Sequence, residues 1–160
     1  VYKRQFSLAA GLNWKGIDFS ILLQGAARSS IYLQQDIAWD NFWGNYYEEH
    51  IGRWTPETAA TATYPRFTKA ATAAHPNYYK SDYWLKDSKY LRLKNIQLGY
   101  TIPRKLLKKF GVRSLRVYAN AYNLFTWDNV KKVDPESSNN SNGQFYPQQK
   151  VINFGINLNF

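Results

Sequence analysis

The segment QKVINFGINLNF, residues 149–160, alternates between apolar and small polar side chains with few exceptions. Side chains of a β-strand point alternately to its two faces, so this segment has one apolar face and one polar face. The apolar face carries Ile152, Phe154, Ile156, Leu158 and Phe160, and the other face carries Val151, Asn153, Gly155, Asn157 and Asn159. Such a strand is typical of a transmembrane β-barrel, which has lipid outside and a hydrated interior.

Two further alternating runs, residues 5–14 and 17–25, flank the dipeptide Lys15-Gly16. A two-residue turn is a common hairpin connection. In the register that this turn sets, the pairs on one face are Trp14 with Ile17, Leu12 with Phe19, Ala10 with Ile21, and Leu8 with Leu23. All of these pairs are apolar, so the turn and both hydrophobic patterns predict the same register.

Two more strands are expected at residues 90–102 and 114–126. In the first of them the apolar positions change parity, which predicts either a β-bulge near Asn95 or an upper part that lies above the membrane. Between these strands, Pro103 precedes and Gly111 follows residues 104–110, an arrangement typical of the ends of a short helix. We therefore expect two short connections, this helical turn and the hairpin, on one side of the sheet.

The segments 26–89 and 127–148 lack strand periodicity and are expected to be long loops. The first is aromatic, is interrupted by prolines, and has a possible short helix between Asp36 and Arg53. Loops this long are unusual in compact soluble domains, whereas transmembrane barrels carry them on the extracellular side. We predict an all-β fold of five antiparallel strands, with both loops extracellular and the C-terminus periplasmic.

Five strands cannot span a membrane alone, because every backbone N–H and C=O in lipid needs a partner and the sheet must close. The smallest single-chain barrels have about eight strands. The strand pattern begins close to Val1 with no signal peptide before it. We therefore expect the chain to be part of a longer polypeptide.

The composition limits the possible classes of protein. The chain has 160 residues, 6 Trp, 13 Tyr, 9 Phe, no Cys and a formal charge of +10. No run approaches the ~20 apolar residues of a membrane helix, and without cysteine there are no disulfides or thiolate metal sites. The charge indicates either a solvated basic surface or an anionic partner, which would be nucleic acid or acidic lipid headgroups.

No group of residues predicts catalysis, a metal or a cofactor. The histidines, His50 and His75, have no carboxylate at metal-ligand spacing. Glu48 and Glu49 are adjacent and diverge on a helix or a strand, which disfavours a catalytic pair. Residues 134–143 are acidic and amide-rich but lack the regular ligand spacing of a calcium loop, so calcium binding by the outer loops stays open. We predict that the protein is not an enzyme.

Several motifs resemble one known family. The densest is YWLKDSKYLRLKNIQLGYTIP, residues 83–103, in which an LRLKN block precedes a GYTxP turn. The others are RWTP at 53–56, YPR at 64–66, LRVY at 115–118, NLFT at 123–126, DPE at 134–136, YP at 146–147 and the terminal FGINLNF at 154–160. Together they resemble the C-terminal end of SusC/RagA-type TonB-dependent transporters of Bacteroidota, with residues 1–53 the weaker part of the match.

The resemblance implies a fold and a function for the whole protein. It implies a barrel of about 22 strands with a plugged lumen, of which this chain supplies the last five. It also implies import of glycans or peptides at the bacterial outer membrane, driven by TonB, together with a SusD-like surface lipoprotein. The plug, the segment that contacts TonB and the rest of the barrel are absent from this chain, so the cargo and the energy-coupling residues are not identified by it.

Three sets of residues are candidates for function. Flat aromatic rings bind sugars and anchor interfaces, so ligand or lipoprotein contact is possible for Trp39, Phe42, Trp43, Tyr46, Tyr47 and Trp54. The alternative is that these rings pack on each other to hold the loop together. The inward face of the sheet predicts a lumen lining of Arg92, Arg116, Tyr118, Asn120 and Tyr122, which would otherwise support the plug or neighbouring side chains. The terminal Phe160 resembles the assembly signal of outer-membrane barrels.

A soluble all-β module that binds carbohydrate or nucleic acid is the alternative function, because the chain is basic and aromatic. The solvent face of a soluble sandwich normally carries many Lys, Glu and Thr residues. The polar faces of the first and last strands carry Asn, Ser, Gly and Ala instead, which favours the barrel and disfavours nucleic acid as a partner.

Overall fold

A computed structural model describes residues 3–35, 38–42, 44–69, 74–130, 133–137 and 146–160. The chain divides into two compact units. The sheet unit comprises Val1–Ser29, Ser88–Asn129 and Pro147–Phe160, and the loop unit comprises Ser30–Asp87 and Val130–Tyr146. Within the described ranges, no helix has the length and apolar character needed to cross a membrane.

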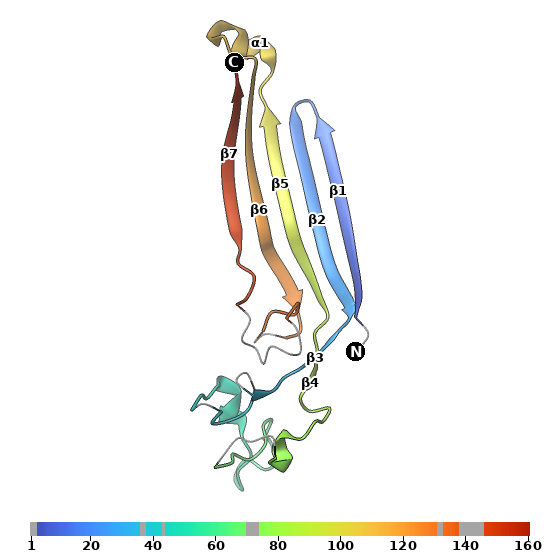
Figure 1. The fold of residues 1–160 in the computed structure, drawn as a ribbon, viewed down its shortest axis with the longest axis vertical. Helices are drawn as coiled ribbons and strands as arrows, with labels where there is room; N and C mark the ends of the chain where they lie inside the picture. The colour runs from blue at the N-terminus through green and yellow to red at the C-terminus, as the bar shows by residue number, and fades with distance from the viewer. Residues whose placement is uncertain (1–2, 36–37, 43, 70–73, 131–132, 138–145) are drawn as a thin grey trace. The chain divides into compact units, whose positions relative to one another are not determined.

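The sheet unit is one antiparallel sheet whose spatial order follows the chain (Figure 1). Its five strands are β1 (Arg4–Trp14), β2 (Ile17–Arg28), β5 (Tyr90–Thr101), β6 (Ser114–Asp128) and β7 (Val151–Asn159). The prediction of five antiparallel strands is confirmed. The strands extend further than expected at Arg28 and Asp128, and the last one is shorter than residues 149–160.

The short connections follow from local backbone chemistry. Lys15 and Gly16 have φ of 47° and 89°, the left-handed pair that a type I′ hairpin requires. The hairpin sets the predicted register, from Trp14 opposite Ile17 to Leu8 opposite Leu23. The other connection is the predicted helical turn, formed by α1 (Arg104–Leu107) and the 3₁₀ turn η4 (Lys108–Phe110), and it ends at Gly111 with φ of 67°.

A β-bulge explains the change of parity in β5. Lys94 is skipped in the pairing with β2, so Asn95 lies opposite Leu22 while Leu93 lies opposite Leu23. The pairing with β6 shifts at the same level, where Asn123 has a φ of 51°. The bulge returns Leu93 to the face of the other apolar residues, and of the two explanations that the sequence allowed, the bulge is the correct one.

The loop unit contains short elements that the sequence pattern did not predict. Strand β3 (Ser30–Tyr32) pairs with β4 (Leu85–Asp87), and the 3₁₀ turns are η2 (Glu48–Gly52) and η3 (Pro76–Tyr78). Three-residue strands are too short to show an alternation, so the periodicity alone could not locate them. The helix that the sequence allowed between 36 and 53 is reduced to η2, and residues 36, 37 and 43 lie outside the described residues.

Candidate functional site

The apolar face of the sheet is continuous across all its strands. One row places Ala10, Ile21, Ile96, Ala121 and Ile152 side by side, and the next row places Leu12, Phe19, Leu98, Ala119 and Phe154 side by side. Phe154 is 82% exposed, and Leu12, Leu98 and Ile152 are also exposed. A soluble sheet buries such a face, whereas a membrane strand presents it to lipid.

Aromatic residues lie at both ends of this apolar face. Phe6, Phe125 and Trp127 lie at the end next to the long loops, and the rings of Phe125 and Trp127 stack at 6.1 Å. Trp14 and Tyr100 lie in one row at the end with the short connections. Phe6 and Trp14 are eight residues apart on β1, or ~27 Å along the strand. This spacing matches two interfacial aromatic belts around an apolar band of ~25 Å.

The opposite face of the sheet is polar and carries an ion pair. Arg116 Nε donates to Asp18 Oδ1 at 2.9 Å, and Arg116 Nη2 donates to Asp18 Oδ2 at 2.5 Å. The pair bridges β2 and β6 across the intervening β5. The side chains of Arg116 and Asp18 are 24% and 26% exposed, so water screens the pair in part. The guanidinium also lies 4.7 Å from the ring centroid of Tyr118.

Two glycines make room for these side chains. A Cβ on Gly99 would lie 2.5 Å from both carboxylate oxygens of Asp18 and 2.6 Å from Arg116 Nη2. A Cβ on Gly155 would collide with the Tyr118 ring that covers it. Because Gly99 and Gly155 have no side chain, the Asp18–Arg116 ion pair and the Tyr118 ring can lie directly against the polar face of the sheet.

The remaining predicted lumen residues share this polar face. Asn120 Nδ2 donates to Tyr122 Oη at 3.2 Å, and Arg92, beyond the bulge, is buried and donates from Nε to Thr126 Oγ1 at 2.9 Å. In the described part of the chain, the amide oxygens of Asn95 and Asn120 are buried without a hydrogen-bond partner. The structure thus brings all five predicted residues to one face; whether they line a lumen stays a prediction.

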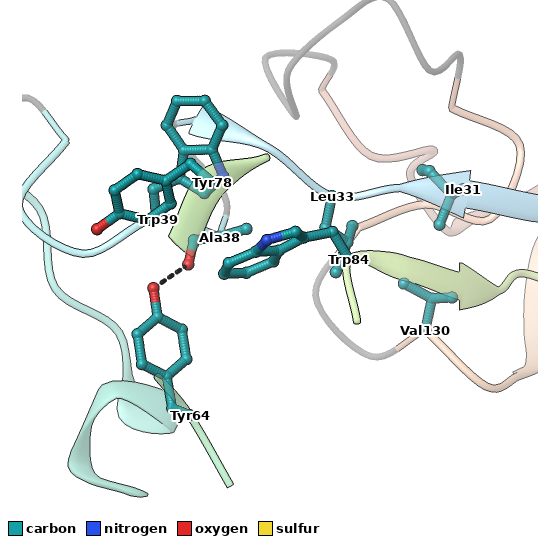
Figure 2. Close-up of a cluster of buried hydrophobic side chains, with 8 residues drawn as sticks. All are labelled: Ile31, Leu33, Ala38, Trp39, Tyr64, Tyr78, Trp84 and Val130. Atoms are coloured by element: carbon teal, nitrogen blue, oxygen red, sulfur yellow. Dashed lines mark hydrogen bonds between the residues drawn. The ribbon is translucent and has the colours of Figure 1, made fainter. Parts of the chain in front are cut away.

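The loop unit has a hydrophobic core of its own (Figure 2). Its buried members are Ile31, Leu33, Ala38, Trp39, Tyr64, Tyr78, Trp84 and Val130. The rings of Trp39 and Tyr78 lie 4.7 Å apart, and Trp84 Nε1 donates to the Asn77 carbonyl at 2.9 Å. The long loop is therefore an ordered, packed structure rather than a structureless connection.

A buried carboxylate organises this core. Asp40 is 1% exposed and accepts hydrogen bonds from the hydroxyls of Tyr78 and Tyr64 and, at 3.0 Å, from the Thr68 backbone N–H. Burial, together with the nearby Asp40 carboxylate, raises the pKa of both Tyr64 and Tyr78 well above the usual value. Both phenols therefore remain protonated donors at physiological pH.

His50 is a structural residue of the loop core. It is 2% exposed, its Nδ1 lies 3.0 Å from the Tyr47 backbone N–H, and its Nε2 lies 3.2 Å from the Ala38 carbonyl. Because Nδ1 accepts a hydrogen bond from the Tyr47 backbone N–H, Nε2 carries the ring proton and donates a hydrogen bond to the Ala38 carbonyl. Within the described ranges, no three His, Cys, Asp or Glu side chains are grouped as a metal site requires.

The structure separates the aromatic loop candidates into two groups. Trp39 is buried and Phe42 packs against it edge to face at 5.7 Å, which supports a packing role for these two residues rather than ligand contact. Tyr46 and Trp54 are exposed and Tyr47 is half-buried, so contact with a ligand or partner stays a prediction for these three. Trp43 lies outside the described residues.

Sequence reasoning missed the partners that position these groups. Asp18, which the sequence analysis did not single out, is the counter-ion of Arg116. Asp40, which the sequence analysis did not single out either, lies buried at the centre of the loop core. The register contains a signal for the ion pair, because Asp18 lies directly opposite Gly99 on the polar face of the sheet. No local pattern indicates the role of Asp40, since its partners are 24 to 38 residues away.

The geometry defines a class of protein. An antiparallel sheet that exposes a continuous apolar face between two aromatic rows, with a polar face behind it, is a segment of a large transmembrane β-barrel. The far edges of β1 and β7 have no partner strand among the described residues, so the sheet is open and needs further strands to close.

Known proteins with similar sequences are TonB-dependent receptors. No family model matches the chain. The chain is 29% identical over 172 residues to TonB-dependent receptor P26 of Formosa agariphila, with 97% of the chain and 17% of that protein covered. It is 26% identical over 155 residues to TonB-dependent receptor SusC of Bacteroides thetaiotaomicron, with 96% of the chain and 15% of that protein covered.

Solved structures agree with these relatives. The chain matches a structure of the RagAB peptide transporter with a TM-score of 0.69 and 25% identity, over 98% of this chain and 17% of that one. These comparisons confirm the resemblance found in the sequence: over nearly its whole length the chain is similar to a C-terminal portion of SusC/RagA-family TonB-dependent receptors. It spans 15% to 17% of the length of these relatives.

Proposed function

We propose that the chain forms part of the barrel wall of an outer-membrane active transporter that imports nutrients, either oligosaccharides or peptides, with energy supplied through TonB. The two-faced sheet carries this proposal, because its apolar face fits lipid and its polar face fits a hydrated or plugged interior. The open edges of β1 and β7 fit a longer barrel that supplies the adjoining strands.

The polar face supports contact with a plug or with cargo. The buried amide oxygens of Asn95 and Asn120, which have no hydrogen-bond partner in the described part of the chain, can accept hydrogen bonds from a plug or from water. The Asp18–Arg116 pair and the ring of Tyr118 give the same face a fixed charge distribution. We assign Arg92, Arg116, Tyr118, Asn120 and Tyr122 to this inner wall.

The loop unit supports contact with a surface partner. Its core holds the loop in one fold, while Tyr46 and Trp54 present exposed rings outside that core. We infer that these rings, with the half-buried Tyr47, contact a SusD-like lipoprotein or the cargo on the extracellular side. On this assignment the C-terminus and the short connections are periplasmic, and Phe160 contributes to recognition by the assembly machinery.

The alternative of a soluble binding module requires the apolar face of the sheet to be covered by a second layer of protein. Within the described ranges nothing covers this face, since Phe154 and Ile152 remain exposed. Fractionation of cells that express the full-length protein distinguishes the membrane barrel from the soluble module directly. The barrel requires detergent for extraction from the outer membrane, and recovery from buffer alone would establish the soluble module.

Deletion of the gene in its native cell tests transport. We expect loss of growth on one class of polymeric nutrient, glycan or peptide, and restoration by the full-length gene. Affinity purification in mild detergent should recover a lipoprotein partner, and the double variant Tyr46→Ala, Trp54→Ala should lower its recovery. Unchanged growth on every glycan and peptide source would contradict nutrient import.

A further inference from the structure

The net positive charge of the chain lies in one of its two units. The sheet unit carries 14 of the 21 Lys and Arg residues and two of the 11 acidic residues, Asp18 and Asp128, which gives a formal charge of +12. The loop unit has a formal charge of −2. The +10 of the chain is therefore a property of the sheet, and a general solvated surface does not explain this distribution.

A dense part of this charge lies in the connection between β5 and β6. Residues 103–113, PRKLLKKFGVR, which we term the basic turn, contain five cations and no acidic residue. The side chains of Arg104, Lys105, Lys108, Lys109 and Arg113 are exposed. Across the sheet edge, the acidic residue nearest in register, Asp18, already pairs with Arg116 and does not neutralise the turn.

The basic turn also exposes apolar side chains. Leu106 is 65% exposed and Phe110 is 76% exposed, while Leu107 is buried and fixes the turn, which contacts β6. Leu106 and Phe110 are four residues apart, the spacing that brings side chains to one side of a helical turn. Cations that surround exposed Leu and Phe side chains are typical of segments that lie in a membrane interface.

The turn lies at the edge of the apolar face. Ile102 N–H donates to the Leu115 carbonyl at 2.8 Å and Arg113 N–H donates to the Asn159 carbonyl at 2.8 Å. The turn therefore lies where β5 and β7 end and β6 begins. In the neighbouring hairpin, Lys15 Nζ lies 5.0 Å from the ring centroid of Trp14, an exposed residue of the aromatic row. A cation is thus already in contact with the belt that meets the headgroups.

We propose that the basic turn and Lys15 dock onto the anionic phospholipid headgroups of the periplasmic leaflet, with the cations on the phosphates and Leu106 and Phe110 between the acyl chains. The proposal rests on the function proposed above, because it needs the apolar face to lie in lipid. Charge complementarity identifies the occupant, and the exposed Leu and Phe favour a lipid surface over nucleic acid, which offers no apolar layer to bury them.

Native mass spectrometry of the purified full-length receptor in detergent tests this docking, with phosphatidylglycerol as the probe and phosphatidylcholine as the zwitterionic comparison. The test variant is R104Q/K105Q/K108Q/K109Q. The matched control, R66Q/K69Q/K80Q/K86Q, removes four exposed cations from the loop unit. A cation near an anionic surface contributes about five-fold to binding, so we expect the turn variant to bind phosphatidylglycerol at least tenfold more weakly.

The control variant should bind phosphatidylglycerol as strongly as the wild type does. Phosphatidylcholine should bind equally to the wild type, the turn variant and the control variant. A second variant, L106S/F110S, keeps every charge but removes the two apolar side chains, and it should also bind phosphatidylglycerol more weakly than the wild type. Inorganic phosphate should not compete with the phosphatidylglycerol that this variant still binds. Equal binding of phosphatidylglycerol by the turn variant and by the control variant would overturn the docking proposal. So would preferential retention of lipopolysaccharide, since that lipid belongs to the other leaflet, or capture of an acidic periplasmic protein in place of lipid.

Failure of the docking is distinguishable from failure of the transporter. Heat-modifiable migration in gels reports barrel folding for each variant independently of lipid retention. A receptor that folds and requires detergent but binds both lipids equally contradicts the docking alone. A receptor that is recovered from buffer without detergent contradicts the membrane location, and with it both proposals.

Discussion

The two units of this chain treat their apolar side chains in opposite ways. The loop unit buries its aromatic residues around Trp39 and Trp84 and has a small negative formal charge. The sheet unit exposes its apolar residues over a whole face and carries a large positive charge. The first arrangement removes its apolar rings from water, whereas the second requires something other than water to cover its apolar face. The difference indicates a boundary between aqueous and lipid surroundings within one chain.

The largest effect is expected in the loop core. Trp39→Ala removes a buried ring that packs against Phe42 and Tyr78, and such a truncation costs ~3–5 kcal/mol. Hydrogen exchange of the full-length receptor should show faster exchange throughout the loop unit and unchanged exchange in the sheet. Tyr79→Ala, at an exposed position, is the control and should leave both units unchanged. Loosening of the sheet by Trp39→Ala would show that the two units are not independent.

A charge on the apolar face should have the next largest effect. Ile152→Lys lies in the row midway between the two aromatic belts, where Lys costs ~2–4 kcal/mol in lipid. Its neighbour Asn153→Lys points to the polar face and should cost less than ~1 kcal/mol. Denaturant unfolding of the receptor in vesicles measures both. Equal destabilisation by the two lysines would contradict the assignment of the faces.

The ion pair on the polar face predicts a smaller effect. Asp18→Asn, Arg116→Gln and the double variant form a cycle whose coupling free energy should be about 1 kcal/mol, because the pair is bidentate but partly solvated. Gly99→Val should reproduce the loss, since its side chain occupies the space of the Asp18 carboxylate. A coupling free energy near zero would show that the pair contributes nothing to the barrel wall.

The last prediction concerns the loop core, and its effect is confined to alkaline pH. The pKa of Tyr64 and of Tyr78 is raised in the folded loop, whereas an unfolded tyrosine ionises near ~10. The stabilisation is therefore fully present below about pH 10 and is lost as the pH rises further, because the unfolded chain releases the phenolic protons first. Limited proteolysis of the loop between pH 9 and 12 should show this loss, and Y64F/Y78F should make the pH dependence shallower. An equally steep pH dependence of proteolysis in Y64F/Y78F would show that other titratable groups cause the loss of stability.

The sheet was predictable from sequence because its information is local. The alternation from Ile152 to Phe160 and the Lys15-Gly16 turn fix strands and register over short distances. The bulge at Lys94 was also visible, as a change of parity. The loop core was not predictable, since the partners of Asp40 are distant in sequence and aromatic residues such as Trp39 and Trp54 look alike until packing separates them. The counter-ion of Arg116 was missed for the same reason.

Site-directed spin labelling of β7 tests the central claim most directly. The chain has no cysteine, so single cysteines at positions 151 to 158 of this segment can be labelled in the full-length receptor reconstituted in vesicles. Labels at Ile152, Phe154 and Ile156 should be accessible to oxygen dissolved in the lipid and protected from a water-soluble nickel chelate. Labels at Asn153, Gly155 and Asn157 should show low accessibility to oxygen. Protection of the even-numbered positions from both reagents would place the apolar face against protein and contradict the membrane barrel.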